Sequence, residues 1–166
     1  MAHAPAYQTI VVGYDGTRAA ELALDRAATI ASRLQSKLVV VDVVAPMPVE
    51  GIDGAYGLMP YNYYPSFESE QVAEEAIWQQ HREKAEAFLR AMTVDYEFAG
   101  VVGQPAGELV DVAAQREAGL IVVGTREPGF LERAFGGSVS QGVAKHAHCD
   151  VLIVHPPDDD EKKSGD

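Results

Sequence analysis

The sequence contains a single cysteine, Cys149, so its 166 residues cannot form an intrachain disulfide. A lone thiol fits a protein of a reducing compartment. The chain also lacks any run that approaches the roughly 20 apolar residues that span a membrane. Residues 1–8 have no basic region followed by a long apolar stretch, so they do not predict a secretory signal. We therefore expect a cytoplasmic protein.

Basic residues are scarce, with 13 Lys and Arg against 25 Asp and Glu, and the formal net charge is −12. A field of this sign repels nucleic acids and anionic membrane surfaces, so neither is expected as a partner. Part of the charge lies in residues 157–166, which predict an acidic disordered tail that either increases solubility or docks to a partner. The remaining length, residues 1–156, fits one domain.

Strand-like and helix-like segments alternate along the chain. Short runs of β-branched residues predict strands, and the run at 37–44 is apolar enough to be covered on both faces. Apolar residues at helical spacing predict the helices between them. The strands are expected at 9–13, 37–44, 95–102, 120–124 and 151–154, and the helices at 19–34, 69–92, 106–117 and 139–146.

This order predicts an α/β fold, a single doubly wound domain with a mainly parallel sheet and helices on both faces. Ligands of such sheets bind beyond the carboxyl ends of the strands, where the strand order reverses. Asp15 follows the first strand and Gly124 ends the fourth, so these two ends are the first places to look for a site. Residues 45–68, rich in Pro, Gly and Tyr, predict a long loop that serves as a lid, a partner surface or a plain surface loop.

The best-known phosphate-binding motifs are missing. The chain has no G-x-x-x-x-G-K-[ST] sequence and no G-x-G-x-x-G after its first strand. What it has instead is Gly124 at a strand end and, thirteen residues later, Gly137 and Ser138 before a helix. Unpaired N–H groups and the positive end of the helix dipole favour an anion there, and Ser138 and Ser140 add hydroxyl donors. The alternative is that these residues are only turn glycines and an N-cap serine.

Three separated motifs point to one known family. The C-terminal motif pairs Gly124 with Gly137, Ser138 and Val139 and continues into HAHCDVLIV at residues 146–154. The first strand and turn read IVVGYDGT at residues 10–17, and a G-x-P turn reads GQPA at residues 103–106. Together these motifs resemble the universal stress protein family over about residues 7 to 156. The resemblance implies a five-stranded domain that is usually dimeric and, in many members, binds ATP or another adenine nucleotide.

The resemblance also implies a set of binding residues. Asp15 and Val43 would lie against the adenine and its ribose. Glycines would line the phosphates, and the start of the last helix would donate hydrogen bonds to them. The full set expected from matching positions and their neighbours is Tyr14, Asp15, Val43, Val123, Gly124, Arg126, Glu127, Gly137, Ser138, Val139 and Ser140.

Glu127 departs from the ATP-binding pattern, which has glycine at that position. A carboxylate about 4 Å from a phosphate charge costs on the order of 1 to 4 kcal/mol, depending on solvation. Arg126 or a divalent cation such as Mg²⁺ can offset this cost. AMP, cyclic AMP or adenosine would be affected less than ATP, because fewer charges would meet Glu127.

The remaining candidate residues have structural interpretations beside functional ones. Asp15 is expected to form the turn and accept from a ligand rather than act as a catalytic carboxylate. His146 and His148 have metal-like spacing but no third ligand placed by the sequence, and Cys149 is expected to be buried and inert. The resemblance implies that the strand at 151–154 lies at the sheet edge and pairs with its copy in a homodimer, and an exposed edge strand favours such pairing.

Three functions follow for comparison. The leading one is a nucleotide-responsive universal stress protein that changes a partner surface in stress response or signalling. The second is a ligand-free, dimeric interaction module, which Glu127 favours. The third is a slow ATP hydrolase, which the sequence disfavours because it offers no Walker-type lysine, no metal-binding carboxylate pair and no evident base.

Overall fold

The computed structural model describes residues 7–45, 67–125 and 139–157. Its elements confirm the predicted alternation, and the first four strands match the expected bounds to the residue. Helix α2 begins at Phe67, so the last two residues of the expected 45–68 loop are helical, while residues 46–66 lie outside the described ranges. The elements are β1 (Thr9–Gly13), α1 (Arg18–Leu34), β2 (Lys37–Val44), α2 (Phe67–Leu89), β3 (Asp95–Val102), α3 (Pro105–Gln115), β4 (Leu120–Gly124), α4 (Val139–His146) and β5 (Asp150–Val154).

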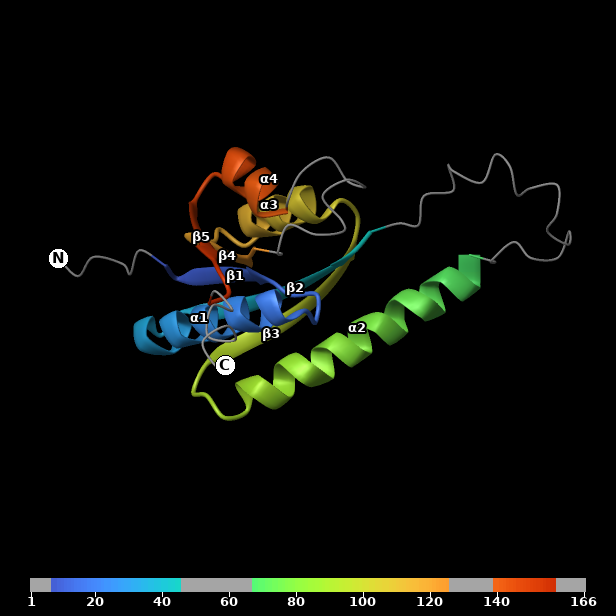
Figure 1. The fold of residues 1–166 in the computed structure, drawn as a ribbon, viewed down its shortest axis with the longest axis horizontal. Coiled ribbons are helices and arrows are strands. Elements are labelled where there is room, and N and C mark those ends of the chain that lie inside the picture. The colour runs from blue at the N-terminus through green and yellow to red at the C-terminus, as the bar shows by residue number, and fades with distance from the viewer. Residues whose placement is uncertain (1–6, 46–66, 126–138, 158–166) are drawn as a thin grey trace, which may run out of the picture.

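The five strands form one sheet in the order β3-β2-β1-β4-β5, and every pairing is parallel. The fold is therefore the doubly wound α/β domain that the sequence predicts. The chain moves outward from β1 to β2 and β3 and then returns to the other side of β1 with β4, so the order reverses between β1 and β4. Figure 1 shows α1 and α2 on one face of the sheet and α3 and α4 on the other.

Each face of the sheet has its own apolar core. Ile10, Val12 and Val40 pack against α1 and the end of α2, while Val11 and Val39 pack against α3 and α4. Burial on both faces explains why the central strands read as continuous apolar runs. The inner face of α1 is mostly alanine, which lets this helix lie close to the strands. Its buried residues are Ala19, Ala20, Ala23, Leu24, Ala27, Ala28 and Ala31.

Helix α2 is anchored much less completely than α1. Only Ala85 and Leu89, near its C-terminal end, are buried among the α2 side chains that the structure describes. Near the middle of α2, the Trp78 indole lies on Gly100 of β3, where an added Cβ would come within 2.5 Å of the ring. The N-terminal half of α2 extends past the sheet in Figure 1. None of the helices in the described ranges is long and apolar enough to cross a membrane.

Candidate functional site

The carboxyl ends of β1, β2 and β4 lie side by side at one edge of the sheet. Gly13 pairs with Val41 of β2, and Val12 pairs with Val122 of β4. This register brings Asp15, which follows β1, to the same edge as Val43 and Gly124. Because the strand order reverses here, the fold gathers predicted site residues from three strands where doubly wound proteins bind ligands.

The turn from β1 to α1 is built around the Asp15 carboxylate. Its Oδ1 accepts hydrogen bonds from the Thr17 backbone N–H at 3.1 Å and from the Thr17 hydroxyl at 2.6 Å. Thr17 is the N-cap of α1, and its Oγ1 accepts from the Ala20 N–H at 3.3 Å. Between them Gly16 has a φ of +73°, which glycine adopts without the steric cost that other residues incur. Asp15 thus forms the turn and holds its side chain at the sheet edge.

Tyr14 lies beneath this turn and not on its surface. The residue is 3% exposed, and its ring belongs to the core on the α1 face. Its backbone N–H donates to the Val41 carbonyl at 2.8 Å. Burial, followed by the charges of Glu21, Asp15 and Asp42, raises the pKa of the Tyr14 phenol to about 12. Tyr14 therefore stays protonated, and its ring packs in the core under the turn that carries Asp15.

Gly124 is required by packing against a neighbouring helix. Its φ is not positive, so a sharp turn is not what demands glycine here. A Cβ at this position would lie 2.4 Å from the Ala19 carbonyl oxygen in the first turn of α1. The preceding Val123 is 3% exposed and packs into the core on the other face. The end of β4 is thereby pressed against the start of α1.

The start of α4 is the remaining described part of the predicted site. Val139 is 36% exposed, whereas Ser140 is 5% exposed. Gly142 lets α4 approach the first turn of α3, because a Cβ there would come within 2.7 Å of the Ala106 side chain. Since α3 follows the carboxyl end of β3, this contact keeps the start of α4 on the site side of the sheet. Four predicted residues lie outside the described ranges, namely Arg126, Glu127, Gly137 and Ser138.

The structure adds a pair of residues that the sequence reasoning missed. Asp42, 1% exposed in β2, lies 2.6 Å through its Oδ2 from Nδ1 of His81 in α2. The pKa of the Asp42 carboxyl is raised, mainly by burial. The hydrogen bond and charge of His81 act to lower this pKa, and the charge of Asp15 acts to raise it. The His81 ring also meets the Tyr14 ring edge-on, with centroids 6.2 Å apart.

One signal of this pair was present in the sequence. Asp42 interrupts an otherwise apolar strand, and a buried carboxylate needs a partner. The partner is 39 residues farther along the chain, beyond a long segment of irregular composition, and only the folded structure identifies it.

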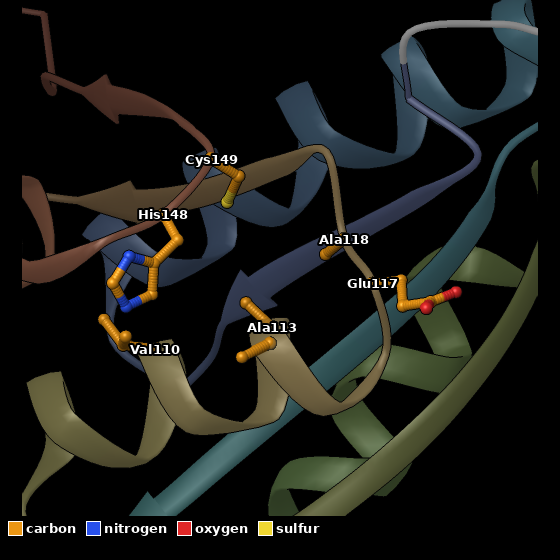
Figure 2. A pocket seen from close by; sticks show the side chains of 7 residues that line it. Val110, Ala113, Glu117, Ala118, His148 and Cys149 are labelled. Carbon is orange, nitrogen blue, oxygen red and sulfur yellow. The ribbon is translucent and has the colours of Figure 1, made fainter.

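A shallow hollow occupies the opposite, amino edge of the sheet (Figure 2). Its volume is about 370 Å³, and it lies between the end of α3 and the start of β5. Cys149 lines it and is half-buried, so the expectation of a buried cysteine is wrong: the residue immediately precedes β5, the edge strand of the sheet, and borders the hollow. Burial and the nearby Asp150 raise the pKa of the thiol, which keeps it protonated. The lining residues are Val110, Ala113, Ala114, Glu117, Ala118, His148 and Cys149.

The two histidines near this edge have separate surroundings. Nδ1 of His146 lies 2.9 Å from the Gly142 carbonyl oxygen, one turn back in α4. His148 is exposed at the hollow. No group of three or more potential metal-binding side chains occurs within residues 7–45, 67–125 and 139–157.

Comparisons with known proteins agree with the fold and the motifs. Residues 6–155 match the model of the universal stress protein family. A universal stress protein of Methanocaldococcus jannaschii is 32% identical over 153 residues, covering 91% of this chain and 84% of the relative. A universal stress protein of Mycobacterium tuberculosis is 32% identical over 150 residues, covering 90% and 97%.

Solved structures give the same result. A crystal structure of a universal stress protein in complex with cAMP superposes with a TM-score of 0.62 at 32% identity, covering 90% of this chain and 97% of that one. The universal stress protein UspA from Lactobacillus plantarum superposes with a TM-score of 0.68 at 27% identity, covering 89% and 97%. With the family model matching nearly the whole described fold, the chain belongs to the universal stress protein family.

Proposed function

We propose that this protein binds an adenine nucleotide at the carboxyl edge of its sheet and acts as a nucleotide-responsive regulator in stress response or signalling. The observation that supports this most strongly is the gathering of Asp15, Val43 and Gly124 where the strand order reverses. A relative of similar length and 32% identity is described in complex with cAMP. The proposed setting is the cytoplasm.

The two halves of the ligand would meet different chemistry. The carboxylate of Asp15, fixed by Thr17, accepts hydrogen bonds and therefore suits the ribose hydroxyls. Val43, at the end of β2, offers an apolar surface for the adenine. The start of α4, with Val139 and Ser140, suits the phosphate, since helix N-termini attract anions. Gly124, Arg126, Gly137 and Ser138 are proposed to complete the phosphate side.

Charge at Glu127 sets the proposed ligand preference. AMP or cyclic AMP is expected to bind more tightly than ATP, because a triphosphate brings more negative charge to this carboxylate. A repulsion of about 1.4 kcal/mol corresponds to a tenfold weaker affinity. Mg²⁺ would reduce the difference by neutralising part of the triphosphate charge. A Glu127→Gly variant should gain affinity for ATP and change little toward AMP.

Calorimetric titration of the intact protein with AMP, cyclic AMP and ATP tests the proposal. Asp15→Asn keeps an acceptor for the turn but removes the charge, so AMP affinity should fall by roughly tenfold, as expected for a lost hydrogen bond to a charged group. Asp111→Asn, on the exposed side of α3, is the matched control and should bind as the wild type does. If millimolar concentrations of all three nucleotides give no heat of binding, the proposal is wrong.

The proposed assembly is a homodimer formed through β5. This strand is at the edge of the sheet, and edge strands present unpaired N–H and C=O groups to a second chain. The residues from Val151 to Val154 would pair with their copies across a twofold axis. Sedimentation equilibrium should give twice the chain mass of 17.8 kDa. A single-chain mass at micromolar concentration would contradict the dimer.

Regulatory binding is proposed in preference to hydrolysis. A binding protein of this kind acts when its ligand favours one of two conformations, which requires different affinities for the two. No catalytic step is therefore assigned to the site. Phosphate release from ATP should equal the uncatalysed background, and a protein-dependent rate would favour the hydrolase alternative instead.

A further inference from the structure

His81 presents one side of its ring to the turn that carries Asp15. A Cβ built on Gly16 would lie 2.9 Å from both Nε2 and Cδ2 of His81, so this edge of the imidazole faces Gly16 directly. The opposite nitrogen, Nδ1, is held by Asp42 at 2.6 Å. Asp42 is 1% exposed and lies in β2, between β3 and β1, so its hydrogen bond to Nδ1 fixes the orientation of the His81 ring.

Nε2 has hydrogen-bonding capacity that the described residues do not use. Within those residues the Asp42 contact is the hydrogen bond that His81 makes. The His81 side chain is 19% exposed, so it can be reached from the sheet edge. When Nδ1–H donates to the carboxylate, Nε2 of the neutral ring is an acceptor, and in the charged ring it is a donor. A hydroxyl group satisfies either state because it both donates and accepts.

The charges around His81 select against a phosphate at this position. Asp15 raises the pKa of the Asp42 carboxyl that contacts His81, and Glu21, Asp15 and Asp42 all raise the pKa of the adjacent Tyr14 phenol. Carboxylates near the imidazole disfavour an anion and favour groups that donate hydrogen bonds. A sugar diol has this character, and a carboxylate is a common partner of ribose hydroxyls in doubly wound folds.

We propose that His81, oriented by Asp42, is a second ligand-binding side chain beside Asp15 and that the two share the hydroxyls of the nucleotide ribose. The inference rests on the proposed nucleotide site and deepens it by assigning recognition of the sugar. Asp42 is a positioning residue in this arrangement, because it acts only through the imidazole. The site would thereby prefer ribonucleotides to their deoxy analogues.

The competing explanation is that the pair only fastens α2 to the sheet. Both explanations predict some loss of stability when the pair is broken, so stability does not separate them. Discrimination between ligands does, because an anchor has no reason to distinguish AMP from an analogue that lacks one hydroxyl.

The experiment measures the affinities of the intact protein for AMP, 2′-deoxy-AMP and 3′-deoxy-AMP. In the wild type, at least one deoxy analogue should bind roughly tenfold more weakly than AMP, the change expected when a hydrogen bond is lost. His81→Phe keeps a ring but cannot form the bond, so it should bind AMP as weakly as that analogue and lose the discrimination. His148→Ala, an exposed histidine at the other edge, should behave as the wild type does.

Nitrogen NMR of the wild-type imidazole keeps the test independent of how the variant folds. The Nε2 resonance of His81 should shift on adding AMP and shift less on adding the poorly bound analogue at equal occupancy. Equal binding of all three ligands by the wild type, or discrimination that survives in His81→Phe, would overturn the assignment. Those outcomes leave nucleotide binding itself intact, whereas failure of AMP to bind at all would refute the underlying proposal.

Discussion

Replacing His81 with alanine should destabilise the fold by about 2 kcal/mol at pH 7, which is within the range for a buried charged group that loses its hydrogen-bond partner. The Asp42 carboxylate, 1% exposed, would then remain in the core without the imidazole at 2.6 Å. The edge-on contact with the Tyr14 ring, at 6.2 Å between centroids, would be lost as well. Urea unfolding at fixed protein concentration measures the difference.

The penalty should shrink as the pH falls. The pKa of the Asp42 carboxyl is raised in the folded protein by burial, so the folded state holds its proton more tightly than the unfolded chain does. That contribution to stability is complete below the unfolded pKa of 3.8 and is lost as the pH rises through the folded value. Because His81 lowers the pKa, its removal raises it further. In His81→Ala the loss of stability on raising the pH is therefore larger, and the penalty at pH 4 should be less than half that at pH 7.

Two further variants isolate the charge. Asp42→Asn in the His81→Ala background removes the buried carboxylate and should recover part of the lost stability at pH 7, since removing both partners costs less than leaving one unpaired. His148→Ala should stay within about 0.5 kcal/mol of the wild type, as surface substitutions usually do. If His81→Ala unfolds at the wild-type urea concentration, or if its penalty is the same at pH 4 and pH 7, the reasoning about this pair is wrong.

Four positions, three glycines and one helix cap, give additional predictions. Gly124→Ala should cost about 1 to 3 kcal/mol in thermal or urea unfolding, since its Cβ would meet a backbone oxygen of α1 at 2.4 Å. Gly107→Ala, on α3 with no atom within 4 Å of the new Cβ, is its matched control and should stabilise by about 0.5 to 1 kcal/mol. Thr17→Ala should cost about 1 kcal/mol through loss of the N-cap, while Thr17→Ser keeps the hydroxyl and most of the stability. Gly100→Ala should displace the Trp78 indole and shift the fluorescence of this only tryptophan to longer wavelength; unchanged emission would contradict the packing.

The sequence predicted the sheet well because local and global signals agree there. Strands such as β1 and β2 are buried on both faces, and because both faces must be apolar, their sequences are continuous runs of mostly β-branched residues. The N-cap at Thr17 was predictable for the same reason, since cap chemistry is local. The spatial neighbours of these segments follow from the handedness and alternation of the crossovers.

Contacts between residues far apart in the chain could not be predicted from these local signals. The need for glycine at position 124 was visible, but its cause, the carbonyl of Ala19 on α1, depends on how closely that helix lies against β4. The Asp42–His81 pair depends on which face of α2 meets the sheet, and this helix has few buried residues to indicate that face. Tyr14 was expected at the ligand, yet its ring lies in the core because side chains alternate between the two faces of a strand and its extension.

An AMP titration followed by backbone amide NMR would locate the ligand on the intact protein. We expect saturable shifts at Asp15, Val43, Gly124 and Ser140, with the residues of the hollow between α3 and β5 unchanged. Shifts confined to Ala113, Ala118 and Cys149 in that hollow, or no shifts at millimolar AMP, would show that the carboxyl edge of the sheet is not a nucleotide site.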